Sequence, residues 1–484
     1  GEGCAPLEAW SAKNPIFVIA QVYLNGVSAG EAYLSEVGSQ VYAVGTNGYD
    51  ITEDVKSRLA ARGDQMITNQ DIPVPTWFVN YDAADHSLQY WKTANDCSPS
   101  GTQNADYGTV YVQAGDSDAW QTQYAGPISK VAVDSRQSLS GREIHDFLTC
   151  YTRYDNTSAY GNALMLRGDY TDVIVNAHKS PDRYAEQKVT MPDGATATMI
   201  CTIVDIEGEP REILFYIPDN ASELQPDGAP VITAWAGGSQ TNIIFFDSTC
   251  WWETANQNGI ALIFTNEAYN TSVAVTPADV DACYHAMLDL LEGWNDSGKF
   301  QFDLSRIYST GQSMGSMESQ QFAQETPDYY AAVASTSFYQ DYPDAHSDKP
   351  IPTYLINGEG NGKDDTGTPY DDRWNRTDDW AQYFLRVNGF VYTPAVYAAD
   401  GTVTTFGVPV SEPVFTVTGP YDRFETYTWI NEQDIPLVQY TNSLYRPHNC
   451  LTSEIPMLWD FLEHYRCERD EDGAVTARYY SASA

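Results

Sequence analysis

The sequence predicts an α/β protein in which a mainly parallel β-sheet flanked by helices is preceded by a β-rich N-terminal region. From residue 185 onward, short apolar runs alternate with segments of helical periodicity, a pattern typical of right-handed crossovers between parallel strands. Before that point the chain has short β-branched runs separated by turn residues. We therefore expect a β-rich accessory region over residues 1–184 and an α/β domain over residues 185–484.

The first region is expected to consist mostly of strands. Residues 15–34 alternate like a strand and contain an Asn-Gly pair that is typical of a tight turn. A short helix is expected at 49–63. Two more strands are expected, at 106–115 and at 128–135. These periods and spacings indicate no particular chemistry.

The second region has a succession of buried strands. Residues 229–238 form a short apolar run that ends in glycines, as a central strand of a parallel sheet does. A helix is predicted over 277–294, because Pro277 suits a first helical position and apolar residues follow at helical spacing. The other expected strands are 260–268, 305–311, 330–336, 352–358 and 435–443.

The chain is strongly acidic, with 66 acidic and 26 basic residues and a net charge of −40 over 484 residues. Such a surface repels nucleic-acid phosphates and anionic lipids, so we expect neither as a partner. No run of eighteen apolar residues is present, so no membrane span is predicted. We interpret the acidity as a solubility feature and predict a secreted or cell-surface protein.

Eight cysteines are present, without a Cys-x-x-Cys pair or a Cys/His cluster at zinc spacing. The sequence therefore predicts no metal site and no cofactor. An even number of cysteines in an acidic chain predicts an exported protein with disulfides. Cys450 and Cys467 bracket a short segment and are one candidate pair, with two unrelated buried thiols as the alternative. Cys4 is a weak candidate for a lipid anchor, since Gly1 replaces the usual leucine.

The motif Gly-Gln-Ser-Met-Gly at 311–315 follows an expected strand and opens a helix-compatible segment that continues to Pro327. A serine on so tight a strand-to-helix turn needs small neighbours, and the two glycines supply them. Its hydroxyl would project above the sheet, and the backbone N–H of Met314 would point at a developing oxyanion. The pattern therefore predicts that Ser313 is a nucleophile.

A serine nucleophile needs a base, and His448 is the best candidate. Three of the seven histidines lie in the first region, and His285 lies in the helix before the serine. Of the remaining three, His346, His448 and His464, only His448 lies between the last strand and the last amphipathic helix of the domain. That is where an α/β-hydrolase carries its base.

Residues 303–337 resemble the nucleophile segment of the polyhydroxybutyrate depolymerase and feruloyl esterase-like group of α/β-hydrolases. The shared features are an Asp-x-x-Arg-hydrophobic-Tyr lead-in, Gly-x-Ser-x-Gly, and a Pro-Asp-aromatic segment before an Ala-Ala-Val-Ala strand. The similarity covers about residues 185–467 and includes the motif Pro-His-Asn-Cys at 447–450. It does not cover the first region. Ser316 departs from the pattern, since many relatives have a glycine there.

The resemblance implies a second oxyanion donor after the strand 229–238, and Gly237, Gly238 and Ser239 are the candidates. It also implies an aspartate three residues after Gly358, where this chain has Asn361. The acid must then come from a neighbouring position. Its candidates are Asp364 and Asp365, preferred over Glu359, and a triad without an acid is the remaining alternative.

Taken together, the sequence predicts a secreted serine esterase that acts on a polyester, a feruloyl-type ester or a smaller ester. Residues 391–432 are expected to form an inserted hairpin above the pocket, and the candidate pocket-lining aromatics are Trp251, Trp252 and Phe338. A serine peptidase of the same fold is one alternative. A binding or adhesion protein with a weakened site is the other.

Overall fold

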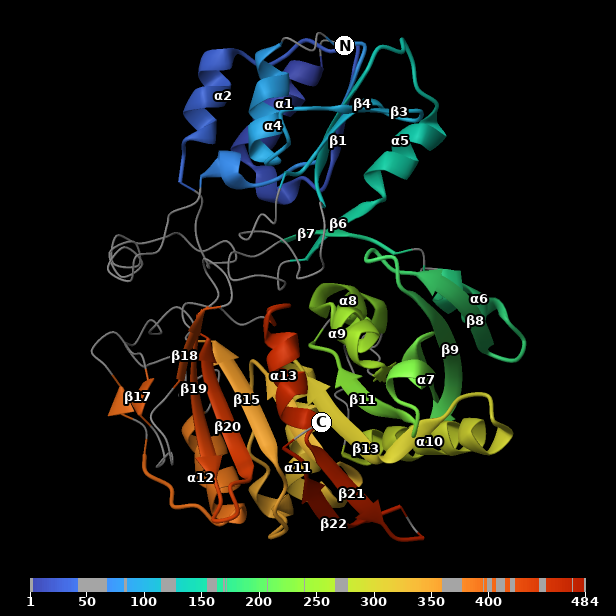
Figure 1. Ribbon diagram of the computed structural model, residues 1–484, viewed down its shortest axis with the longest axis vertical. Helices are drawn as coiled ribbons and strands as arrows, with labels where there is room; N and C mark the ends of the chain where they lie inside the picture. Colours follow the sequence, from blue (N-terminus) through green and yellow to red (C-terminus); the bar gives the residue numbers. More distant parts are fainter. Residues whose placement is uncertain are drawn as a thin grey trace. The chain divides into compact units, whose positions relative to one another are not determined.

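The computed structural model shows two compact units, one formed by residues up to 168 and the other by later residues (Figure 1). The structure describes residues 3–41, 68–81, 85–114, 128–154, 163–168, 170, 172–206, 208–238, 240–265, 277–358, 377–394, 396–397, 403–405, 414–417, 423–443, 450–471 and 473–482.

The first unit contains a five-stranded sheet in the order β1-β2-β5-β4-β3. Strands β1, β2 and β5 run parallel, and β4 and β3 are antiparallel. The strands of this unit are β1 (Gln21–Leu24), β2 (Thr76–Val79), β3 (Thr102–Asn104), β4 (Gly108–Val112), β5 (Lys130–Asp134), β6 (Tyr151–Tyr154) and β7 (Ala163–Leu166). Its α-helices within the described residues are α1 (Cys4–Lys13), α2 (Glu31–Gly38), α4 (His86–Ala94) and α5 (Gly141–Leu148).

The expectation of a β-rich first region is wrong for the described residues, because helices and strands alternate there. Residues 15–34 contain only one short strand, β1, and their last residues begin α2. Leu34 and Val37 are buried on one face of α2 at a spacing of three. Asn25 has a positive φ of 51°, but it ends β1 and does not connect a hairpin. The helix expected over 49–63 lies outside the described residues.

The second unit is built on an eleven-stranded sheet. Its order is β18 (Val414–Val417), β19 (Arg423–Ile430), β20 (Pro436–Ser443), β15 (Thr353–Gly358), β14 (Ala332–Thr336), β13 (Phe302–Gly311), β11 (Ala229–Trp235), β12 (Ala261–Phe264), β10 (Glu209–Pro218), β9 (Thr196–Ile206) and β8 (Tyr184–Thr190). The six central strands from β20 to β12 are parallel, and the flanking strands are antiparallel. The predicted strands at 229–238, 305–311, 330–336, 352–358 and 435–443 all lie in this parallel part.

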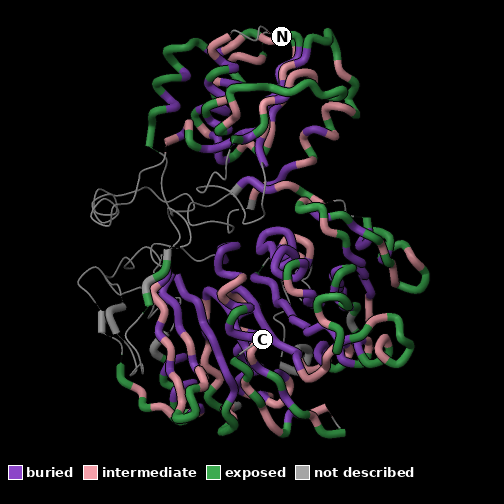
Figure 2. The backbone as a smooth tube through the Cα atoms, viewed as in Figure 1, coloured by how far each residue is buried: buried purple, intermediate pink, exposed green. Residues whose placement is uncertain are grey.

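Helices cover both faces of this sheet, and most residues of the central strands are buried (Figures 1 and 2). On β10, Phe215 packs against Trp294 of one helix, while the next residue, Tyr216, packs against Phe246 on the opposite face. The helices are α6 (Asp172–Lys179), α7 (Ala221–Leu224), α8 (Asn242–Thr249), α9 (Trp251–Asn258), α10 (Pro277–Ser297), α11 (Met314–Glu325), α12 (Thr377–Val387) and α13 (Glu454–Leu462). The predicted helix over 277–294 is confirmed as α10.

Parts of the predicted insertion at 391–432 belong to the sheet. Strands β18 and β19 extend the parallel part by antiparallel pairing with β20, so they do not form a hairpin above the pocket. Separate two-stranded ribbons are formed by β16 (Val396–Tyr397) with β17 (Val403–Thr405) and by β21 (Tyr465–Arg469) with β22 (Val475–Tyr480).

All eight cysteines are described, and none of them forms a disulfide. The suggested Cys450–Cys467 pair is therefore wrong. Cys467 lies on β21, where its Sγ donates to the carbonyl of Ser305 at 3.2 Å, whereas Cys450 precedes α13. Within the described part of the chain, no helix has the length and apolar character needed to cross a membrane.

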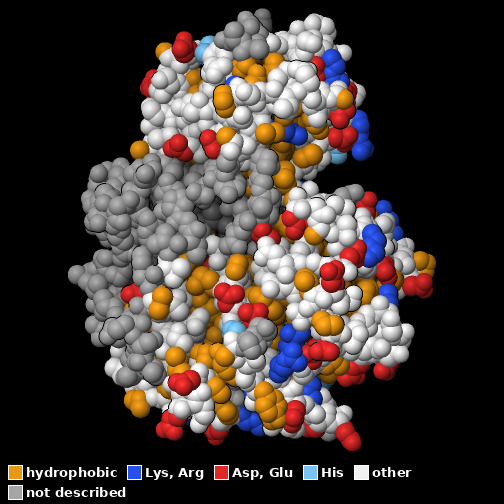
Figure 3. Space-filling model, viewed as in Figure 1, with side chains coloured by type: hydrophobic (Ala, Val, Ile, Leu, Met, Phe, Trp, Pro, Cys, Tyr) orange, Lys and Arg blue, Asp and Glu red, His pale blue; other side chains and the backbone are white. Residues whose placement is uncertain are grey.

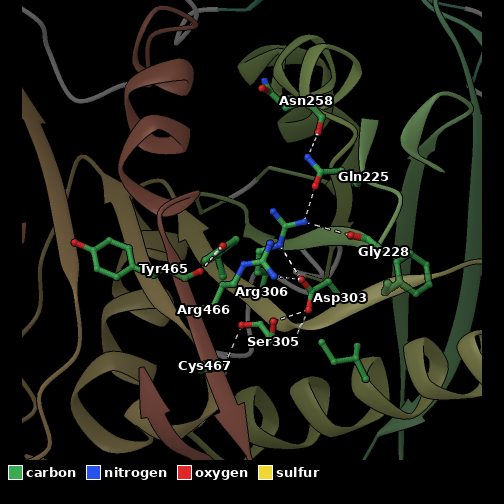
Figure 4. Close-up of polar contacts among 12 residues, drawn as sticks. Gln225, Gly228, Asn258, Asp303, Ser305, Arg306, Tyr465, Arg466 and Cys467 are labelled. Atoms are coloured by element: carbon green, nitrogen blue, oxygen red, sulfur yellow. Dashed lines mark hydrogen bonds and ion pairs between the residues drawn. The ribbon is translucent and has the colours of Figure 1, made fainter. Parts of the chain in front are cut away.

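The Asp-x-x-Arg lead-in to the serine segment has a structural role. Figure 4 shows Arg306, midway along β13, donating from Nε to Asp303 at 2.9 Å and from Nη2 to Gln225 and the carbonyl of Gly228. Asp303 also accepts from Ser305 and lies 3.4 Å from Arg466. This buried network fixes β13 at the edge of the sheet opposite Ser313.

The order of the strands identifies where a ligand would bind. After β11 the chain crosses to β12 on one side, and it then returns to β13 on the other side of β11. In open α/β sheets, ligands bind at such a reversal, outside the carboxyl ends of the two strands. Here those ends are adjacent, since Trp235 of β11 pairs with Gly311 of β13.

Candidate active site

Ser313 lies on a strained turn at this reversal point. Strand β13 ends at Gly311, α11 begins at Met314, and Ser313 between them has φ 57° and ψ −115°. A positive φ is costly for a residue with a side chain and persists only where the surroundings enforce it. The strand, turn and helix predicted around the motif are therefore present, together with the backbone strain that exposes a nucleophile.

The two glycines of the motif allow this turn by close packing. A Cβ on Gly315 would lie 1.9 Å from the carbonyl oxygen of Trp235 on β11. A Cβ on Gly311 would lie 2.1 Å from the carbonyl oxygen of Gly315. Both contacts are with backbone, which cannot rotate away, so only glycine fits either position.

Backbone hydrogen bonds hold the turn from both neighbouring strands. Gln312 donates its N–H to the carbonyl of Trp235 on β11 at 3.3 Å, and Ser313 donates its N–H to Thr336 of β14 at 3.2 Å. The first turn of α11 is closed by Met317, which donates to the carbonyl of Ser313 at 3.0 Å. The position of Ser313 is thus determined by β11, β14 and the helix together.

The N–H of Met314 is available as an oxyanion donor, because it has no acceptor among the described residues. It is the first N–H of α11, where unpaired donors and the helix dipole favour negative charge. Gly238 is adjacent, since a Cβ on it would lie 3.6 Å from Met314 Sδ. Gly237 differs, because its N–H donates to Gln240 Oε1 at 2.9 Å. The structure thus brings Gly238 and Met314 together, and Ser239 lies outside the described residues.

The predicted base, His448, and the candidate acids, Asp364, Asp365 and Glu359, lie outside the described residues, as does Asn361. The strands that precede them are described. Gly358 at the end of β15 pairs with Ser443 at the end of β20, and β14 separates β15 from β13. Since these strands are parallel, β15 and β20 both end at the edge of the sheet that carries Ser313.

The other histidines considered as the base lie elsewhere. His346 Nε2 lies 2.6 Å from Asp341, and the neighbouring Ser347 donates to the carbonyl of Gln324 near the end of α11. That end is about 16 Å along the helix from Ser313, given a rise of about 1.5 Å per residue. His464 Nδ1 lies 2.8 Å from the carbonyl of Ser481 in the terminal ribbon. Neither therefore serves Ser313.

The aromatic residues expected to line the pocket divide into two groups. Trp251 and Trp252 are fully buried in α9, so they belong to the core and do not line an open site. Phe338 is partly exposed just after β14, and its carbonyl accepts from Ser316 Oγ at 2.6 Å. This bond explains the departure at position 316, because a glycine there would leave the Phe338 carbonyl without this donor.

Glu318 is a buried ionisable residue of α11 that the sequence did not reveal. It is buried in α11, five residues after Ser313, and its carboxyl oxygens have no hydrogen-bond partner among the described residues. Burial raises the pKa of Glu318 to about 8, and the charge of Arg211 opposes this shift only in part. The sequence signal that could have indicated its burial is its spacing of four residues from Phe322. Residues at that spacing lie on the same face of a helix.

No protein-family model matches this chain, and no curated protein does. Solved structures with a similar arrangement include esterases. A thermostable esterase shares 15% identity, with 54% of this chain and 60% of its own length covered and a TM-score of 0.33. An acetyl xylan esterase from Aspergillus awamori shares 13% identity, with 55% and 94% covered and a TM-score of 0.34. A glucuronoyl esterase from Solibacter usitatus shares 13% identity, with 58% and 85% covered and a TM-score of 0.35. Similarities at this level decide nothing about the chemistry of this chain.

Replacement of Gly315 by alanine tests the close packing of the turn. We expect Gly315→Ala to lower the free energy of unfolding by about 3 kcal/mol, because its Cβ would overlap the backbone of β11. Gly238→Ala is the matched control, since the added Cβ would meet only the flexible sulfur of Met314 within 4 Å among described atoms outside the adjoining residues. Urea unfolding followed by tryptophan fluorescence measures both, and a fully stable Gly315→Ala variant would contradict the packing.

The buried carboxyl of Glu318 predicts a pH-dependent stability. Between about pH 4.3 and pH 8 the unfolded chain loses this proton and the folded chain keeps it, so stability falls as pH rises. The loss is at most about 1.4 kcal/mol per pH unit. Glu318→Gln should remove this slope in urea unfolding between pH 5 and pH 8. Glu325→Gln, at the partly exposed end of α11, should keep it, and parallel curves for all three proteins would refute the prediction.

Proposed function

We propose that the protein is an α/β-hydrolase that cleaves carboxylic esters with Ser313 as its nucleophile. The observation that carries this proposal is the strained Ser313 backbone at the carboxyl edge of β13, directly before α11. Six parallel strands with helices on both faces support the fold. The adjacent Gly238 and the N–H of Met314, which has no acceptor in the described part of the chain, supply what an oxyanion site requires.

In the proposed mechanism, Ser313 Oγ attacks the ester carbonyl carbon while His448 takes its proton. The carbonyl oxygen becomes negatively charged and accepts hydrogen bonds from the N–H groups of Met314 and Gly238. His448 then protonates the leaving alcohol, which breaks the ester bond and leaves an acyl-serine. Water activated by His448 releases the acid. One carboxylate of Asp364, Asp365 and Glu359 orients His448.

We further propose that the substrate is a polyester, a feruloyl-type ester or a smaller ester, and that the protein is extracellular. The even spread of acidic side chains over the face seen in Figure 3 supports a solubility role for the charge. The first unit would then be an accessory region that binds or positions a polymer. Ester cleavage is preferred over peptide cleavage, because esters react more readily with the same triad.

Ser313→Ala should reduce hydrolysis of a short nitrophenyl ester by about 10³-fold or more, since the acyl-enzyme can no longer form. Ser222→Ala is the control, because Ser222 is exposed on α7. Circular dichroism should be unchanged in both variants. Comparison with the nitroanilide of the same acid distinguishes an esterase from a peptidase. Full activity of Ser313→Ala would exclude this serine as the nucleophile.

The triad assignment predicts that His448→Ala is nearly as inactive as Ser313→Ala, because the two residues act as a unit. Among Asp364→Asn, Asp365→Asn and Glu359→Gln, one variant should lower kcat by about 10²-fold to 10⁴-fold, and the other two should be close to wild type. Steady-state kinetics on the nitrophenyl ester measures all four. An active His448→Ala variant would mean that the base lies elsewhere.

A further inference from the structure

The side chain of Met314 lies directly beside the proposed oxyanion site. Its sulfur is 3.6 Å from the position that a Cβ on Gly238 would occupy, and no other described atom outside the adjoining residues lies within 4 Å of that position. The side chain is partly exposed. A chemical change at this sulfur would therefore take place beside Gly238, whose N–H is one of the two groups proposed to hold the oxyanion.

Met314 is also more accessible than most methionines of the chain. Of the seven described methionines, four are almost completely buried, namely Met165, Met191, Met199 and Met287. The partly exposed ones are Met314, Met317 and Met457. Met317 lies three residues further along α11 and does not come within 4 Å of the position that a Cβ on Gly238 would occupy. It therefore differs from Met314 in position but not in chemistry.

Two of the three partly exposed thiols, those of Cys97 and Cys150, react slowly with an oxidant. Burial raises the pKa of Cys97 to about 12 and also raises the pKa of Cys150. Peroxide oxidises the thiolate form, which is scarce at neutral pH for such groups. A thioether needs no ionisation, so the partly exposed methionines react without this restriction.

We propose that Met314 is an oxidation site at which peroxides switch the enzyme off, an inference that rests on the proposed function. The sulfur lone pair attacks one oxygen of hydrogen peroxide, so an S–O bond forms and the O–O bond breaks. Sulfur is oxidised by two electrons, and the peroxide is reduced to water after proton transfer to the departing oxygen. The product is methionine sulfoxide beside Gly238.

The sulfoxide interferes with the reaction through its charge distribution. Its oxygen carries partial negative charge and accepts hydrogen bonds, so it competes for the N–H groups of Gly238 and Met314 and repels a developing oxyanion. Loss of one oxyanion donor costs about 10²-fold to 10³-fold in kcat in serine hydrolases. We expect a loss of at least about tenfold here, mainly in kcat, because the oxyanion forms only as the reaction proceeds.

The test compares wild type, Met314→Leu and Met317→Leu before and after treatment with hydrogen peroxide. Activity on the short nitrophenyl ester is expressed as a fraction of the untreated activity of the same variant. Peptide mass spectrometry measures the addition of one oxygen atom at each methionine. Wild type and Met317→Leu should lose at least about tenfold in step with oxidation of Met314, and Met314→Leu should lose less than about twofold.

Restoration of wild-type activity by methionine sulfoxide reductases would support the proposal, since these enzymes reverse this modification. Equal inactivation of Met314→Leu and wild type would overturn it, as would full activity with Met314 oxidised. If untreated wild type hydrolyses no ester, the proposed function fails separately. The mass measurement then still decides whether Met314 is oxidised faster than Met317 and Met457, and a slower rate would overturn the modification site.

Discussion

The structure of the site depends on two close backbone contacts, that of Gly315 with β11 and that of Gly311 with Gly315. Ser313 has a positive φ, which costs roughly 1–3 kcal/mol for a residue with a side chain. The contact of Gly315 with Trp235, and the N–H bonds to β11 and β14, hold the residue in this conformation. The same contacts position Ser313 and the first residue of α11, Met314, so the proposed nucleophile and the proposed oxyanion donor depend on one feature.

The buried face of α11 is unusually polar for a helix that packs on a central sheet. Ser316 and Gln320 bond to Ser335 of β14, and Ser319 bonds to Ser309 of β13. These bonds fix the rotation of the helix with short polar contacts, where apolar side chains would only fill space. Glu318 is the exception, because it is buried without a described partner and weakens the helix as pH rises. Such departures from a stable core are typical of functional sites.

The sequence alone predicted the parallel part of the sheet and the serine turn, because both have local signals. Apolar runs ending in glycine mark β11 and β13, and the spacing of glycines around Ser313 reflects a steric requirement of that turn. The helices of the first unit were missed, because an alternating run as short as 15–34 fits a strand and a helix start equally well.

Other features depend on three-dimensional contacts that spacing does not encode. The cysteines near the end of the chain were paired by proximity in sequence, but Cys467 faces β13 instead. Trp251 and Trp252 resembled pocket residues, yet α9 buries both. The proposed acid of the triad could not be identified by a fixed offset from Gly358, because Asn361 occupies that position.

The central claim is that Ser313 is an activated nucleophile, and covalent labelling tests it most directly. A fluorophosphonate reacts with a serine only where a base and an oxyanion site activate it. Treatment of the native protein, followed by intact mass and peptide mapping, is expected to show one label, on Ser313, and none after heat unfolding. A folded protein that takes up no label, or takes it up at another residue, would contradict the account.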